Sequence, residues 1–197
     1  DHFDSETPFR EMGISCQRCH GDAQQHVKTH RQGTFETEHF IVNPAKLPTV
    51  EKESICNQCH LSGKYRAPRY GKSFFDFQPG MKLSDVWSVF IANSTGQGNN
   101  AAPILSHVEQ MHASVCYQSP ATNMTCTSCH DPHFNPTHAE KIEFYRNKCL
   151  NCHSPSGTQC SEPIDPRTNS SAKNSCFACH MPRIPNSDIA HSSQSDH

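Results

Sequence analysis

A pattern of two cysteines, separated by two residues and followed directly by a histidine, occurs five times along the chain. Two thiols at this spacing can add to the two vinyl groups of one porphyrin edge from a single turn of chain, and the histidine then lies beneath the iron as an axial ligand. The predicted attachment residues are Cys16, Cys19, Cys56, Cys59, Cys126, Cys129, Cys149, Cys152, Cys176 and Cys179. The predicted proximal ligands are His20, His60, His130, His153 and His180.

Cysteine pairs with this spacing also occur in zinc sites and in disulfide frameworks. A zinc site does not require a histidine directly after the second cysteine, yet all five pairs here have one. Zinc sites of this kind also use such pairs two at a time, and five pairs leave one over. The pattern therefore predicts five covalently bound haem c groups, each with its iron.

The chain has 15 histidines, so enough remain outside the motifs to give every iron a second ligand. His133 follows His130 by three residues and cannot reach the far face of the same haem, but it can ligate the next haem along the chain. His107 lies on one face of an expected helix, from which it can point rigidly at an iron. Methionine is the other common axial ligand, but with so many histidines we interpret the methionines as packing residues. The predicted distal ligands are His26, His107, His133, His191 and His197, with His2, His39 and His112 in reserve.

Two cysteines, Cys116 and Cys160, lie outside the motifs. An exported protein with two spare thiols often pairs them, so a disulfide between these residues is one hypothesis. Two buried thiols are the alternative.

The composition indicates a thin protein core and an exported protein. Hydrophobic residues make up 34% of the 197 residues, below the usual range for globular domains, so the porphyrins would supply much of the buried apolar surface. A formal net charge of -2 argues against a nucleic-acid partner. We find no apolar run long enough for a transmembrane helix. Haem attachment of this kind follows export, so we expect a periplasmic or extracellular protein whose signal peptide has been removed.

The fold class expected is a multihaem cytochrome c fold, mostly irregular with short α-helices and little or no β-sheet, in which a stack of haems forms the core. We predict one domain over residues 1–197, with a looser part at 1–80 that holds two haems, a helical part at 81–120 and a dense haem block at 121–197. Apolar periodicity predicts helices over 81–91 and 103–115. A third helix is expected from about 138 to 150, after a capping box of Thr137 and Glu140. Each motif is expected on a short helical turn.

Several segments resemble a family of exported multihaem cytochromes related to the nitrifier-type tetrahaem cytochromes. They are GISCQRCHG at 13–21, IVNPAKL at 41–47, ICNQCHL at 55–61, FQPG at 77–80, CTSCHDPH at 126–133, YRNKCLNCH at 145–153 and CFACHMPR at 176–183. The resemblance implies that members of the family also have histidines at the positions of His26, His107, His133 and the C-terminal His197, and cysteines at those of Cys116 and Cys160. It also implies that this chain is a processed form or a piece of a longer precursor, since relatives often continue further.

Electron transfer through mainly bis-histidine, low-spin haems is the predicted function, because irons with six ligands have no open site for a substrate. Redox proteins would then be the partners. A second hypothesis is a subunit of an extracellular filament, in which His2 or His197 ligates a haem of a neighbouring copy. A third is a multihaem reductase, which would need one haem with an open face.

Overall fold

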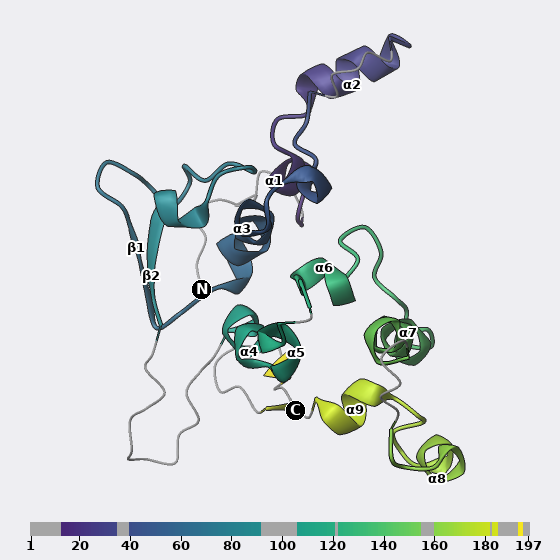
Figure 1. Cartoon of the computed structure of the whole chain (residues 1–197). Helices are drawn as coiled ribbons and strands as arrows, with labels where there is room; N and C mark the ends of the chain where they lie inside the picture. Colours follow the sequence, from purple (N-terminus) through teal and green to yellow (C-terminus); the bar gives the residue numbers. More distant parts are fainter. Residues whose placement is uncertain are drawn as a thin grey trace, which may run out of the picture. The chain divides into compact units, whose positions relative to one another are not determined.

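The computed structural model describes residues 13–34, 40–91, 106–120, 122–154 and 160–181, and the backbone of 183–184 and 193–194. These residues are mostly helical or irregular, and two short two-stranded sheets are the β-structure among them (Figure 1). The predicted fold class, a small multihaem cytochrome fold with little β-sheet, agrees with this architecture. The chain forms two compact units, the first from Asp1–Cys59 and Tyr65–Phe90 and the second from His60–Lys64 and Ile91–His197. The single-domain organisation stays a prediction.

The first unit combines short helices with a β-ribbon. Its strands pair antiparallel, with Tyr65 opposite Phe90 and Pro68 opposite Trp87. They lie side by side in Figure 1. The elements are α1 (Gln17–His20), α2 (Gln24–Arg31), the 3-10 helix η1 (Pro44–Lys46), α3 (Thr49–His60, whose last residue belongs to the second unit), β1 (Tyr65–Pro68), the 3-10 helix η2 (Leu83–Asp85) and β2 (Trp87–Phe90).

The helix predicted over residues 81–91 is wrong. This segment forms one 3-10 turn, η2, and then the strand β2. Val86, Trp87, Val89 and Phe90 are β-branched and aromatic residues that favour strands. Pairing with β1, which is distant in sequence, satisfies the backbone of β2 and overrides the helical spacing of the apolar residues.

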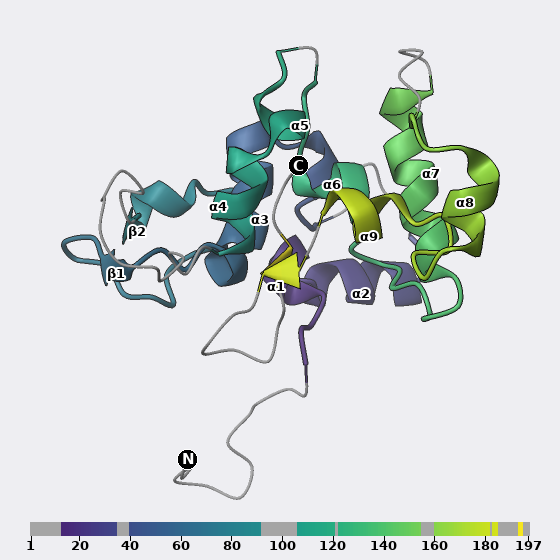
Figure 2. The same cartoon turned by 90° about the horizontal axis from the view of Figure 1, so that it is seen from below.

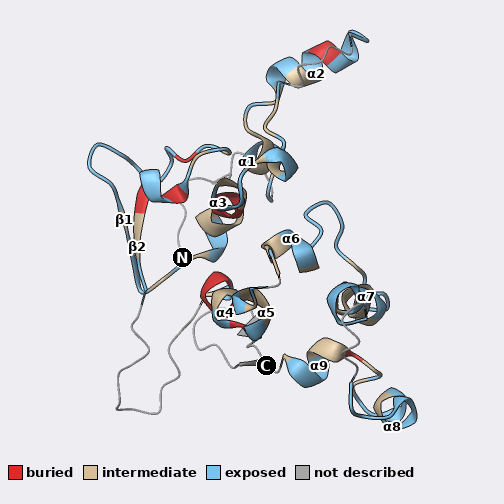
Figure 3. Ribbon diagram, viewed as in Figure 1, coloured by how far each residue is buried: buried red, intermediate tan, exposed pale blue. Residues whose placement is uncertain are grey.

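A small core of apolar side chains holds the first unit together. Val86 is completely buried, and Trp87 is 7% exposed. The indole ring of Trp87 meets the ring of Phe74 edge to face at 5.4 Å between centroids. The buried hydroxyl of Ser54 on α3 accepts a hydrogen bond of 3.0 Å from the amide of Leu83, which ties α3 to η2. Figure 3 shows buried residues on α3 and near η2 and β2.

The second unit consists mainly of short helices that carry the later motifs. Helix α7 packs against both α6 and α9, and Figures 1 and 2 show α9 beside α7. The elements are α4 (His107–Ala113), α5 (Val115–Gln118), α6 (Cys126–Cys129), α7 (Lys141–His153), α8 (Ile164–Asn169), α9 (Cys176–His180), β3 (Arg183–Ile184) and β4 (Ser193–Gln194).

Of the two helices predicted in this unit, one is corrected and the other is confirmed. The segment 103–115 is not one helix, because Ser106 and Ser114 both have extended backbone and each caps the helix that follows it. Its first residues, 103–105, lie outside the described residues. The helix expected from about 138 is confirmed as α7, which begins at Lys141. The reciprocal bonds of the predicted capping box are present, since Thr137 donates its amide to Glu140 Oε2 at 3.0 Å and receives the Glu140 amide on Oγ1 at 3.4 Å. They close the turn before α7, whose own N-cap is Glu140.

Candidate functional site

All five cysteine–histidine motifs lie on helical turns, as predicted. The first, third and fifth motifs lie on the short helices α1, α6 and α9, and the second and fourth end the longer helices α3 and α7. A helical turn brings residues three apart onto neighbouring positions of one face, so the two thiols of each motif share a side of the chain. The motif cysteines and histidines are half-buried or exposed.

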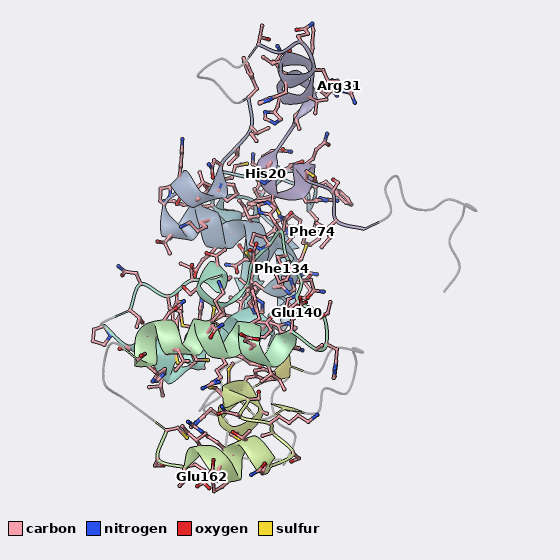
Figure 4. All side chains as sticks on the ribbon, turned by 90° about the vertical axis from the view of Figure 1, so that its right-hand side faces the viewer. His20, Arg31, Phe74, Phe134, Glu140 and Glu162 are labelled. Carbon is pink, nitrogen blue, oxygen red and sulfur yellow. The ribbon has the colours of Figure 1, made fainter. Side chains whose placement is uncertain are left out.

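The imidazole of His20 is fixed by a bond to the backbone. Its Nδ1 lies 2.8 Å from the carbonyl oxygen of Val42, and the Val42 amide donates to the His20 carbonyl at 2.9 Å. Gly21 lets the chain leave α1 at once because its φ of 76° lies in the left-handed region that favours glycine. A proton on Nδ1 leaves Nε2 as the nitrogen for a metal ion. Figure 4 shows His20 at the end of its short helix.

His60, at the end of the second motif, faces the predicted distal ligand His107 on α4. Their ring centroids are 5.5 Å apart and their planes are at 89°. Two imidazoles that share one metal ion through bonds of about 2 Å have centroids roughly 6 Å apart. Rotation about a common axis allows perpendicular planes. The structure therefore brings these two histidines to a spacing that suits an axial pair.

His130, at the end of the third motif, contacts the side chain of Tyr145 on α7. The Tyr145 hydroxyl oxygen lies 3.4 Å from His130 Nδ1, and the two rings meet edge to face at 5.7 Å between centroids. His130 is an exposed residue, but neighbouring groups crowd its ring, and this desolvation lowers its pKa. The charges of His60 and Lys141 lower the pKa of His130 further. The neutral imidazole favoured in this way is the form that binds metal.

The thiols of the later motifs lie close together. Burial, followed by the neighbouring thiol of Cys176, raises the pKa of Cys149 to about 11, and the two side chains are hydrogen-bonded. Burial also raises the pKa of Cys129, with Cys116 the next cause. In the first unit, burial and the thiol of Cys59 raise the pKa of Cys19. Thiols from different motifs therefore lie near one another within each unit.

Three other predicted ligands lie among the described residues, but their contacts do not indicate an axial pair. His26 lies on α2 beside His30, with ring centroids 4.2 Å apart, and His112 stacks on Tyr117 at 4.3 Å. His133 is exposed in the turn after α6, where its amide bonds to Asp131 at 2.9 Å. The ligand roles of all three stay predictions. The predicted ligands that lie outside the described residues are His2, His39, His191 and His197.

The predicted disulfide is not formed in this structure, where Cys116 and Cys160 are both described and both carry thiols. Cys116 is half-buried near Cys129, whereas Cys160 is exposed. The bridge stays a prediction.

Two contacts of the motif histidines were missed from the sequence. The Val42 carbonyl could not have been found, because any residue supplies such an oxygen. Tyr145 had a signal: it lies four residues before Cys149 and so one helical turn away on the same face. Its contact with His130 depends on the packing of α6 against α7, which the sequence pattern does not give.

One known protein is similar to this chain along most of its length. The chain is 23% identical over 179 residues to the multiheme cytochrome MtrA of Shewanella baltica (strain OS185). The similarity is to a multihaem c-type cytochrome. It covers 89% of this chain but 44% of MtrA, so the chain spans less than half the length of that relative. No family model and no solved structure matches the chain.

The described residues fit a covalently held haem. Each motif offers two thiols on one helical turn, and the Nδ1 bond of His20 presents Nε2 as the ligating nitrogen. The spacing of His60 and His107 suits two ligands of one iron. In the described part of the chain, none of the helices has both the length and the apolar character needed to cross a membrane.

Proposed function

We propose that this chain is an exported electron-transfer protein that binds five haem c groups, mainly with two histidine ligands to each iron. When bound, haem supplies a metal centre that takes up and releases single electrons. The chain's own residues determine where these groups are held and how closely they approach one another. The similarity to the multiheme cytochrome MtrA supports the general class.

The observation that carries this proposal is the pairing of His60 with His107. The two side chains come from α3 and α4, which are far apart in sequence, and their ring centroids lie 5.5 Å apart. An enzyme haem needs an open side for its substrate. A histidine held opposite the proximal histidine fills that side and leaves electron transfer as the chemistry.

The residues proposed for each haem follow from the motifs. The two cysteines of a motif form the thioether bonds, and its histidine is the proximal ligand. For the first haem, the Val42 carbonyl orients His20. For the second, Ser106 caps α4 and so fixes the position of His107 at its first residue. We retain His26, His133, His191 and His197 as candidates for the other distal positions.

Export follows from the attachment chemistry. Thioether bonds to haem c are made after the chain leaves the cytoplasm, so we place the protein in the periplasm or outside the cell. Redox proteins are the partners proposed for it.

Intact-mass measurement and spectroscopy of the purified holoprotein test the proposal. We expect a mass that exceeds that of the apoprotein by five haem groups. The ferric spectrum should be that of low-spin haem, and the reduced protein should not bind carbon monoxide. His107→Ala should convert one haem to a form that binds carbon monoxide. His138→Ala, at an exposed histidine outside the predicted ligand set, is the matched control and should leave the spectrum unchanged.

Two results would overturn the proposal. A mass without five added haems contradicts the attachment sites. A high-spin, carbon-monoxide-binding haem in the unsubstituted protein contradicts the ligation and favours a reductase.

A further inference from the structure

Two motif histidines in this structure have different partners at Nδ1. His20 is hydrogen-bonded to the backbone carbonyl of Val42 at 2.8 Å, whereas His130 has the phenol oxygen of Tyr145 at 3.4 Å. A histidine that binds a metal ion through Nε2 carries its proton on Nδ1. At His130 the imidazole N–H would therefore donate and the Tyr145 oxygen would accept.

The position of Tyr145 connects three motifs. It lies on α7, one turn before Cys149 of the fourth motif, and its ring meets the ring of Phe177, within the fifth motif, edge to face at 5.8 Å. The Tyr145 ring also meets the ring of His130 of the third motif at 5.7 Å. Phe144 adds an edge-to-face contact at 5.2 Å. These three aromatic contacts restrict the rotation of the phenol, so its hydroxyl stays near His130.

A hydrogen-bond acceptor at Nδ1 does two things to a metal ligand. It fixes the rotation of the ring about the metal–nitrogen bond, and it makes the imidazole a stronger electron donor. A stronger donor stabilises the ferric iron more than the ferrous iron, because the ferric ion carries the greater charge. The reduction potential of the haem concerned then falls.

We propose that Tyr145 is a positioning residue that orients the His130 imidazole and lowers the reduction potential of the haem ligated by His130. The inference rests on the proposed function, since it requires a haem at the third motif. The 3.4 Å separation is longer than the usual N–H···O distance of about 2.7 to 3.2 Å, so the effect is smaller than that of the 2.8 Å bond at His20.

Tyr145→Phe tests the inference in the full-length holoprotein, because it removes the hydroxyl and keeps the ring that packs against Phe177. We expect one of the haem potentials to rise, with roughly a two- to fivefold change in its ferric-to-ferrous ratio at constant potential. At 59 mV per tenfold change for a one-electron couple, this is about 20 to 40 mV. Potentiometric titration followed by electron paramagnetic resonance resolves the low-spin haems, and one signal should move as the His130 ring is freed.

The matched control is Tyr70→Phe, which removes the same hydroxyl from a fully exposed tyrosine of the first unit. It should leave all potentials and all resonance signals unchanged. Unchanged potentials and signals in Tyr145→Phe would overturn the inference. An equal shift of every haem potential would also overturn it, because that would indicate a general packing role for Tyr145.

Failure of the proposed function has a separate signature. A peptide containing Cys126–His130 is isolated from the unsubstituted protein by proteolysis, and its mass reports whether haem is attached there. If haem is absent, the proposed function fails at this motif and the inference about Tyr145 fails with it. If haem is present and Tyr145→Phe changes nothing, the inference about Tyr145 alone is wrong.

Discussion

The two units differ in how they bury apolar side chains. Among the described residues, the buried apolar side chains of the first unit are Ile55, Phe77, Leu83, Val86 and Trp87, whereas that of the second unit is Val108 (Figure 3). The second unit nevertheless holds the third, fourth and fifth motifs complete. A unit with so little buried apolar surface of its own needs another source of it, because burial is the main stabilising contribution to folding. The first unit has a protein core, whereas the second carries three of the motifs proposed to attach haem and little buried apolar surface.

The largest expected effect is the loss of structure in the second unit when no haem is attached. Hydrogen exchange of the haem-free chain should find amides of α3 and β2 protected more strongly than those of α7 and α9 by at least about tenfold, or about 1.4 kcal/mol in local opening free energy. The reason is that Ile55, Val86 and Trp87 are buried among protein side chains of the first unit. Equal protection in both units would contradict the comparison, and the holoprotein, in which all of these elements should be protected, is the control.

Removing the central aromatic residue of the first unit's core should have the next largest effect. Trp87→Ala deletes a side chain that is 7% exposed and in contact with Phe74 and Arg66, so we expect the free energy of unfolding to fall by about 3 to 5 kcal/mol. Denaturant titration of the holoprotein measures this. Phe75→Ala, at a residue that is 85% exposed, should change it by less than about 0.5 kcal/mol. A similar loss of unfolding free energy in both variants would contradict a core centred on Trp87.

A smaller effect on stability is expected at the start of α4 in the second unit, where Ser106 caps the helix. Ser106 receives the Glu109 amide on its hydroxyl at 3.5 Å, and Glu109 Oε2 receives the Ser106 amide at 2.8 Å. Ser106→Ala should lower stability by about 0.5 to 2 kcal/mol. It should also raise the carbon-monoxide binding of one haem, since His107 begins this helix. Ser106→Thr keeps the cap and is the control. No difference between the two variants would contradict the role of the cap.

The smallest effect concerns one surface carboxylate in each unit. Hydrogen bonds from Ser73 lower the pKa of Asp76, and hydrogen bonds from Thr137 lower that of Glu140. Ser73→Ala removes the hydroxyl bond but keeps the larger backbone bond, so it should raise the pKa of Asp76 only part of the way toward its ordinary value. Thr137→Val removes the larger, side-chain bond and should raise the pKa of Glu140 further toward its ordinary value. Because folding lowers both pKa values, their stabilising contribution is present at neutral pH and is lost as the pH falls through the folded-state pKa. Titration of the carboxyl groups by nuclear magnetic resonance measures both pKa values. Each variant should leave the pKa of the other unit's carboxylate unchanged.

Local features were predictable from the sequence, whereas contacts between distant segments were not. The motif turns and the Thr137–Glu140 capping box depend on residues within one turn of each other, so their pattern is sufficient. The strand β2 was mistaken for a helix because its partner lies far away in sequence. His107 was selected from the sequence as a distal ligand without a partner motif, and its approach to His60 depends on the packing of the chain, which the sequence pattern does not contain.

The reciprocal bonds between His20 and Val42 have a consequence for how these sites tolerate mutation. Because the acceptor for His20 is a main-chain oxygen, no change of side chain at position 42 removes it. The acceptor for His130 is a side-chain hydroxyl, and a single substitution at Tyr145 deletes it. We therefore expect substitutions at position 42 to leave the orientation of His20 intact, whereas a single substitution at Tyr145 can change the surroundings of His130 without changing those of His20.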